Sequence, residues 1–208
     1  MSFETLLKAF RRAVSAAPAY RQLLAERGVE PAAVVDRRTF AALCPVLTRE
    51  NVREAIDRLC AGSSAETAGA DFGLHLCYET PRTRDVRRAA LDDPELAREL
   101  FGECDVTPRV LEYDDRSTLI EVLDLNRQGY GRMTISLLDP ALPVPVLRYQ
   151  PGYLVRLLDP SRVMLAMWRR GCRLTGPLPS ALLALAGHAA DSEGIRASCA
   201  AGEAAALV

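Results

Sequence analysis

The spacing of apolar residues changes near residue 106, and this change constrains the fold more strongly than any other feature of the sequence. Before it, apolar residues recur every three or four positions, as in Phe3–Val14, which is typical of amphipathic helices. After it, short β-prone runs alternate with Asp-Asp, Gly-Tyr-Gly, Asp-Pro and Pro-Gly turn signals. The chain is therefore expected to be α+β, with N-terminal helices followed by an antiparallel β-rich part that forms a meander or a small barrel.

Capping residues and periodicity predict where the helices begin and end. Asp93 followed by Pro94 is a strong helix start, and Gly102 is the matching end. Helices are expected at 2–16, 20–27, 37–43, from Thr48 to near Gly62, at 94–101 and at 178–187.

Strands are expected where β-prone runs lie between turn signals. They are predicted at 72–78, 109–113, 118–123, 132–138, 144–149, 153–158 and 163–168. Four segments follow from this order of elements. They are a helical N-terminal segment (1–62), a segment with a loop, a short strand and a helix (63–106), a β-rich subdomain (107–175), and a short helix with a flexible Ala-rich tail (176–208).

The composition argues against several classes of protein. The formal net charge is −1 and aromatic residues make up 6%, which is not typical of a nucleic-acid-binding domain. No apolar stretch is long enough to span a bilayer and the N-terminus lacks an export signal, so a cytoplasmic protein with free thiols is expected. The six cysteines and two histidines have no finger-like spacing, so no metal site is expected.

Two groups of motifs occur in a fixed order. The first group is Ala17-Pro18-Ala19-Tyr20-Arg21, Gly28-Val29-Glu30-Pro31 and Cys44-Pro45-Val46-Leu47-Thr48-Arg49-Glu50-Asn51-Val52-Arg53. The second is Ile120-Glu121-Val122-Leu123-Asp124, Gly129-Tyr130-Gly131-Arg132-Met133-Thr134 and Pro145-Val146-Leu147-Arg148-Tyr149-Gln150-Pro151-Gly152-Tyr153. Together they resemble the phenylacetate–CoA ligase-like branch of the adenylate-forming (acyl-activating) enzymes. The resemblance implies a truncated relative in which 63–106 is a shortened remnant of the nucleotide-binding subdomain.

Departures from the family pattern imply that this chain makes no acyl-adenylate and uses no cofactor. The loop that would hold the ATP phosphates, Gly62–Gly69, carries Glu66, whose charge repels a triphosphate. The family's acidic residue for the ribose hydroxyls falls on Tyr153, and a phenol cannot accept both hydroxyls as a carboxylate does. The family's C-terminal lid carries a catalytic lysine, whereas Lys8 is the single lysine of this sequence.

A candidate catalytic group consists of His75, Cys77 and Tyr153. Residues two apart in a strand face the same side, so the imidazole of His75 and the thiol of Cys77 would lie next to each other. That pair would permit a thioester-forming nucleophile, with Tyr153 as a further polar group. The alternative is a buried strand end, with a small apolar cysteine and a hydrogen-bonded histidine.

Arginines supply the candidate ligand-binding residues. Arg82 and Arg84 belong to a basic cluster, completed by Arg87 and Arg88, that would hold the phosphates of CoA or of a carrier domain's phosphopantetheine. The alternative is a solvated Arg-rich surface. The resemblance adds Arg148, Tyr149 and Gly152, which would line a ligand pocket or only maintain a strand and its turn.

The sequence favours a non-adenylating accessory or binding protein that recognises an acyl or aryl acid, an acyl thioester or a carrier-bound acyl group in a biosynthetic pathway. The alternatives are a small repurposed enzyme acting on an acyl or aryl thioester, and a structural subunit docking on a larger acyl-activating or biosynthetic enzyme. A homo-oligomer such as a dimer is also expected, because loss of a subdomain leaves apolar surface to be covered. Neither nucleic acid nor a membrane is expected as a partner.

Overall fold

The structure is a computed structural model that describes residues 3–48, 76–140 and 146–188. The chain divides into two compact units, each assembled from three stretches of sequence. Unit 1 comprises Met1–Cys77, Tyr113–Glu121 and Thr134–Pro151, and unit 2 comprises Tyr78–Glu112, Val122–Met133 and Gly152–Val208. Each unit buries an apolar core of its own.

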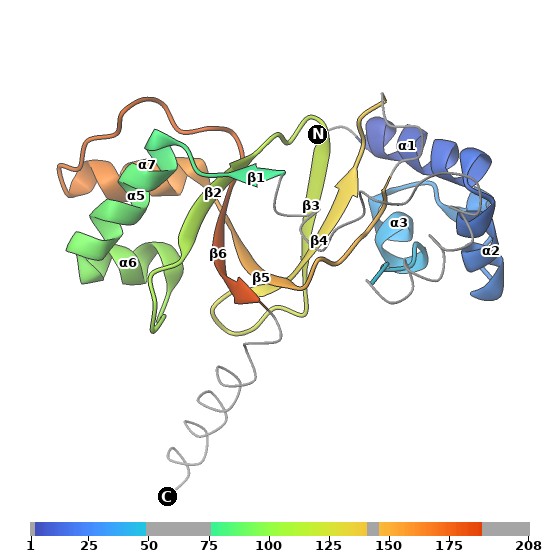
Figure 1. Ribbon diagram of the computed structural model, residues 1–208, viewed down its shortest axis with the longest axis horizontal. Coiled ribbons are helices and arrows are strands. Elements are labelled where there is room, and N and C mark those ends of the chain that lie inside the picture. Colours follow the sequence, from blue (N-terminus) through green and yellow to red (C-terminus); the bar gives the residue numbers. More distant parts are fainter. Residues whose placement is uncertain (1–2, 49–75, 141–145, 189–208) are drawn as a thin grey trace, which may run out of the picture. The chain divides into compact units, whose positions relative to one another are not determined.

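Unit 1 contains the N-terminal helices α1 (Phe3–Ala16), α2 (Pro18–Glu26) and α3 (Arg37–Leu43), with a 3-10 turn at Pro31–Ala33 (Figure 1). Phe10 is buried at the centre of their core. Its ring meets the rings of Tyr20 and Phe40 edge-on, with centroids 6.3 and 6.2 Å apart, a geometry that adds to the gain from burial. The helices predicted at 2–16, 20–27 and 37–43 are therefore confirmed.

Unit 2 contains three further helices, α5 (Pro81–Asp92), α6 (Pro94–Phe101) and α7 (Pro160–Arg169). Each begins with proline in its first turn, and a capping side chain, from Thr80, Asp93 or Asp159, accepts a hydrogen bond from backbone N–H in that turn. Their apolar sides meet in one core. The helix predicted at 94–101 is confirmed, and α5 adds a helix within the expected Arg-rich segment.

In the part of the chain that the structure describes, six strands form one sheet. They are β1 (Cys77–Tyr78), β2 (Arg109–Tyr113), β3 (Thr118–Leu123), β4 (Gly131–Leu137), β5 (Tyr153–Leu158) and β6 (Leu182–His188). Their order is β1-β2-β6-β5-β4-β3, so β3 to β6 are successive neighbours, and the pairs β4–β5, β5–β6 and β2–β6 are antiparallel. Over the described residues the sheet is open, with β1 and β3 at its ends, rather than a small barrel. The α+β class with N-terminal helices is confirmed.

Two predicted elements are wrong. The run 163–168, predicted as a strand, lies in α7, because Asp159 caps a helix whose buried residues recur at helical spacing. The stretch 178–187, predicted as a helix, contains most of β6, and Leu182–Leu185 are buried between the neighbouring strands β2 and β5. Burial in the middle of a sheet outweighs the helix propensity of leucine and alanine.

Some predicted elements lie outside the described residues. They are the helix from Thr48 to near Gly62, most of the strand at 72–78, and the tail beyond 188. Of the run 144–149, the structure describes residues 146–149. Within it, Tyr149 forms isolated β-bridges with Leu47 and Ile135. Within the described ranges, no helix has the length and apolar character needed to cross a membrane.

Candidate functional site

Arg148 is the most deeply engaged of the predicted binding residues. Its side chain is buried in unit 1, where Nη1 donates to the carbonyl oxygens of Ala41 and Cys44, both at 2.6 Å. Nε donates to Glu121 at 3.1 Å in a largely buried ion pair. The backbone at Arg148 is left-handed, with φ of 51°. The guanidinium therefore ties the end of α3 to β3, and these contacts direct it into the protein.

The backbone hydrogen bonds of Tyr149 and the backbone conformation of Gly152 fix the course of the chain after Arg148. Tyr149 exchanges two backbone hydrogen bonds of 2.8 Å with Ile135 on β4. The N–H of Leu47 donates to the Arg148 carbonyl, and the N–H of Gln150 donates to the Leu47 carbonyl, each at 2.8 Å. Gly152 has a φ of 90°, which favours glycine. These backbone hydrogen bonds therefore join residues 148–150 to the segment after α3 on one side and to β4 on the other.

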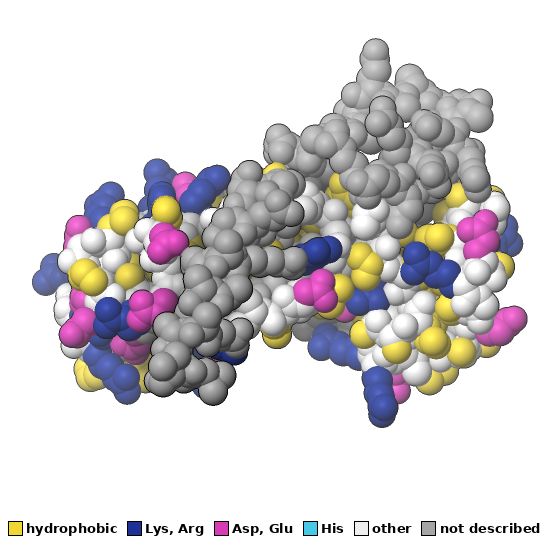
Figure 2. Space-filling model, turned by 90° about the horizontal axis from the view of Figure 1, so that it is seen from below, with side chains coloured by type: hydrophobic (Ala, Val, Ile, Leu, Met, Phe, Trp, Pro, Cys, Tyr) yellow, Lys and Arg dark blue, Asp and Glu magenta, His cyan; other side chains and the backbone are white. Residues whose placement is uncertain are grey.

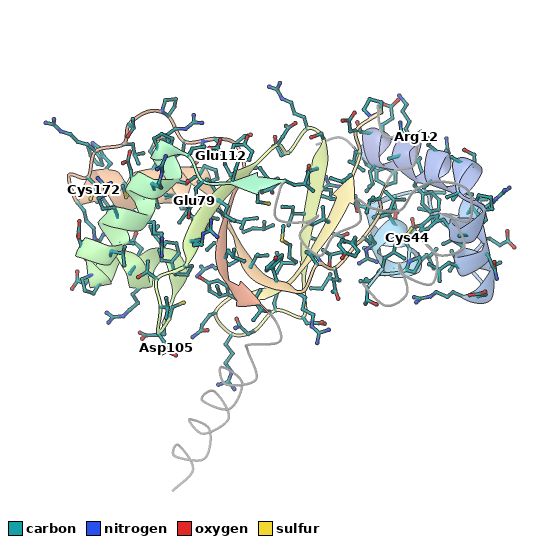
Figure 3. The ribbon with its side chains drawn as sticks, in the orientation of Figure 1. Arg12, Cys44, Glu79, Asp105, Glu112 and Cys172 are labelled. Atoms are coloured by element: carbon teal, nitrogen blue, oxygen red, sulfur yellow. The ribbon has the colours of Figure 1, made fainter. Side chains whose placement is uncertain are left out.

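Cys44 and Tyr20 form a buried polar pair beside Arg148 that sequence reasoning missed. Burial raises the pKa of Cys44 to about 12, although the Tyr20 hydroxyl and the Arg148 charge oppose this shift. Burial also raises the pKa of Tyr20, and the neighbouring thiol adds to that rise. Figure 3 shows Cys44 among the N-terminal helices. The signal in the sequence was that Tyr20 and Cys44 both belong to the first group of motifs.

The predicted nucleophile Cys77 is buried on β1. Burial raises the pKa of its thiol to about 12, so the thiol is protonated at neutral pH and is a weak nucleophile. His75 lies outside the described residues, so its position relative to Cys77 is not part of the structure. Tyr153 is the first residue of β5, where it stands opposite His188 of β6 in the strand register.

Arg82 is held by a buried carboxylate in unit 2. Its Nη2 lies 3.3 Å from both oxygens of Glu112, a β2 residue that is 5% exposed. The hydroxyl of Thr80 donates to the same carboxylate at 3.1 Å, and Arg82 Nη1 donates to the Pro177 carbonyl at 3.1 Å. Figure 3 labels Glu112 next to α5. Arg82 therefore joins α5, β2 and the segment before β6.

The remaining arginines of the cluster lie along α5, and the Nε of Arg87 is buried. Arg84 and Arg88 are exposed and one helical turn apart, and Arg87 is half-buried. Within the described ranges none of the three has a carboxylate partner within 4 Å, and Arg84 donates only to the Thr80 carbonyl. Asp85 is instead hydrogen-bonded to Thr175, which lowers the pKa of its carboxyl group. The charges of Arg84 and Arg88 lower this pKa further, so these two arginines expose N–H donors to an anion while Asp85 offsets part of their charge.

The surface of unit 2 carries both signs of charge. Figure 2, with unit 2 at left, shows Arg side chains that project into solvent with acidic side chains between them. For example, Arg170, which directly follows α7, forms ion pairs with Asp93 and Glu99, each with an N···O distance of 2.8 Å. The described residues contain no cluster of His, Cys, Asp and Glu suited to a metal ion.

Comparison with known proteins adds no relative: no family model, no curated protein and no solved structure matches this chain.

Proposed function

We propose that this protein is a non-adenylating accessory or binding protein that recognises an acyl or aryl group presented as a thioester of CoA or of a carrier domain. One observation carries the proposal. Arg84 and Arg88 are exposed one turn apart on α5, and among the described residues neither has a carboxylate oxygen within 4 Å, although both charges act on the Asp85 carboxylate at longer range.

Phosphate chemistry accounts for the choice of ligand. A guanidinium group offers a planar fork of N–H donors that matches phosphate oxygens and keeps its charge at any physiological pH. Both CoA and the phosphopantetheine arm of a carrier domain carry phosphate at the end of the pantetheine arm opposite to the thioester. Arg84 and Arg88 lie one turn apart on a helix that is capped by Thr80, so their charges are held near each other.

The other candidates leave α5 as the binding surface, and one of them disfavours catalysis. Arg148 and Arg82 donate to groups within the protein. The raised pKa of the Cys77 thiol, about 12, disfavours the thiolate that a thioester-forming nucleophile needs. The resemblance to acyl-activating enzymes supports an acyl or aryl ligand, and Tyr153 at the expected ribose position supports the loss of adenylation.

The test is a binding measurement with CoA, benzoyl-CoA, 4′-phosphopantetheine, benzoate and ATP, by calorimetry and by thermal unfolding. A ligand at 100 times its Kd stabilises the folded state by about 2.7 kcal/mol, which is a clear rise in melting temperature. We expect benzoyl-CoA and CoA to bind, and the double variant Arg84→Ala/Arg88→Ala to bind them at least tenfold more weakly.

The matched control removes the same two charges from exposed positions of unit 1, in Arg11→Ala/Arg21→Ala, and should bind as the wild type does. Equal losses in both double variants would mean that overall charge, rather than the α5 face, attracts the ligand. ATP binding that persists in the α5 variant, with release of pyrophosphate in the presence of benzoate, would overturn the proposal in favour of an adenylating enzyme.

A further inference from the structure

The exposed side of α5 carries two arginines and a leucine in line, here called the α5 stripe. Its members Arg84, Arg88 and Leu91 are separated by four and three residues, which places them on the same side of the helix. All three are exposed, and Leu91 is 58% exposed. The buried residues of α5 lie on another side, in the core of unit 2. The α5 stripe therefore offers a partner charged and apolar contact together.

The stability of the helix does not account for this arrangement of charges. The N-terminus of a helix is the positive end of its dipole, yet Arg84 lies in the first turn of α5 and Asp92 lies in the last. Arg84 and Arg88 also repel each other, as like charges four residues apart do. Asp85, beside the stripe, offsets part of this repulsion. An acidic partner would relieve the rest, so charge complementarity is the first requirement on the partner.

The length of the α5 stripe indicates the shape of that partner. The Cβ atoms of Arg84 and Arg88 lie roughly 6 Å apart, as expected one turn apart on a helix. Leu91 lies about 10 Å along the axis from Arg84 at the helical rise per residue. A small phosphate ligand reaches the arginines and leaves Leu91 in water. A partner helix with two carboxylates one turn apart, followed by an apolar residue, covers all three side chains.

We propose that the α5 stripe docks the acidic helix of a phosphopantetheine carrier domain. This inference rests on the proposed function and names the form in which the thioester arrives, on a carrier domain instead of on free CoA. A carrier domain combines both required features, because its phosphopantetheine arm leaves from a serine beside an acidic surface. Free CoA meets the same arginines through its phosphates but lacks the contact with Leu91, so it binds more weakly.

The experiment measures the binding of a free-standing acyl carrier protein by calorimetry. The carrier is used in its apo form, which has no arm, and in its benzoyl-phosphopantetheine form, with CoA as the small ligand for comparison. We expect both carrier forms to bind more tightly than CoA. The Kd of the apo form should lie within about tenfold of the Kd of the benzoyl form, because most of the docking contact is made by the acidic helix.

Charge reversal locates the contact. Arg84→Glu/Arg88→Glu should raise the Kd of both carrier forms at least about tenfold. The matched control, Arg11→Glu/Arg21→Glu at exposed positions of unit 1, should leave that Kd unchanged. A carrier in which two carboxylates of the acidic helix are replaced by lysine should bind Arg84→Glu/Arg88→Glu at least about tenfold more tightly than it binds the wild type.

Leu91 separates a partner helix from a phosphate ligand. Leu91→Ala removes the apolar end of the α5 stripe without changing its charge, and it should raise the Kd of the apo carrier at least about threefold. Leu125→Ala, at a site 63% exposed on another part of unit 2, is the matched control and should bind the apo carrier as the wild type does.

The outcomes distinguish this inference from the proposed function. CoA binding without binding of either carrier form would overturn the inference and leave the proposed function standing, and so would binding of the benzoyl form alone. Absence of binding by every ligand would overturn both. Carrier binding that is unchanged in Arg84→Glu/Arg88→Glu would also overturn the inference. If that variant does not fold, as judged by far-UV circular dichroism, the apo carrier and Leu91→Ala still decide the question.

Discussion

At the scale of single residues, Arg148 combines a buried charge with a left-handed backbone, and these two properties can be separated by mutation. Its guanidinium group donates hydrogen bonds to the carboxylate of Glu121 and to the carbonyl oxygens of Ala41 and Cys44. Removing one member of a buried, hydrogen-bonded ion pair leaves the other without compensation. We therefore expect Arg148→Ala to lower the free energy of unfolding by about 3–5 kcal/mol, measured by urea denaturation.

The effect of the backbone follows from comparing alanine with glycine at this position. A φ of 51° costs an L-residue about 1–2 kcal/mol but costs glycine little. Arg148→Gly should therefore be about 1 kcal/mol more stable than Arg148→Ala. The control is Arg132→Ala, whose ion pair with Asp124 is exposed and 3.7 Å long, with an expected loss below about 1 kcal/mol. An equal loss in Arg148→Ala and Arg132→Ala would show that the buried pair contributes little.

The buried thiols predict how stability depends on alkaline pH. The pKa of Cys77 is raised by burial from 9.0 to about 12. Between these values the unfolded chain loses the proton first, so each such thiol stabilises the folded state fully below pH 9 and less as pH rises toward 12. The slope is about 1.4 kcal/mol per pH unit for one group. Wild type should therefore lose stability faster above pH 9 than Cys77→Ala does.

The measurement is urea denaturation at half-unit steps from pH 8 to 10.5. Val86→Ala, at another fully buried position, changes packing without removing an ionisable group and should keep the wild-type slope. Parallel curves for wild type and Cys77→Ala would show that the thiol ionises in the folded protein as it does in water. That result would also restore Cys77 as a candidate nucleophile.

At the scale of elements, Thr80 connects a helix start to a strand. Its hydroxyl caps α5 in a capping box with Thr83 and also donates to Glu112 on β2. Thr80→Ala removes both contacts, so we expect it to destabilise the protein by about 2 kcal/mol. Thr80→Ser restores a capping hydroxyl and should recover most of the loss. Equal thermal stability of the two variants would contradict this role.

Helix starts that are marked by a capping side chain and a proline can be predicted well from the sequence. Asp93-Pro94 and Gly102 predicted α6 because capping depends on neighbouring residues alone. Asp159-Pro160 is the same pair, but the sequence interpretation treats it as a turn between two strands and predicts a strand at 163–168, where the structure has α7. β6 was missed because its environment comes from β2 and β5, which lie far from it in sequence.

The candidate site was predictable only in part for the same reason. The basic cluster was visible as four arginines close together in sequence. The partners that hold Arg82 and Arg148 lie 30 and 107 residues away, so no local spacing indicated which arginines face solvent and which are tied into the protein. The Cys44–Tyr20 pair was missed because it depends on the packing of α2 against the segment after α3.

At the scale of the whole molecule, neither unit is a continuous piece of chain. β3 begins in unit 1 and its last two residues, Val122 and Leu123, belong to unit 2, whereas β4 passes from unit 2 into unit 1 after Met133. Unfolding of one unit therefore frays strands that the other unit requires. Two cores linked in this way are expected to unfold in a single cooperative transition.

Leu24→Ala tests this expectation because it disturbs the core of unit 1 alone, at a side chain that is 1% exposed. Such a truncation costs about 2–5 kcal/mol. If unfolding is cooperative, the slowest-exchanging amides of β6 in unit 2 lose protection by the same free energy as those of α1 in unit 1, as measured by hydrogen exchange with mass spectrometry. Val35→Ala, at an exposed position of unit 1, should leave both unchanged. Loss of protection confined to α1 would mean that the chain unfolds in two steps, because β6 would then remain folded while the core around Leu24 is open.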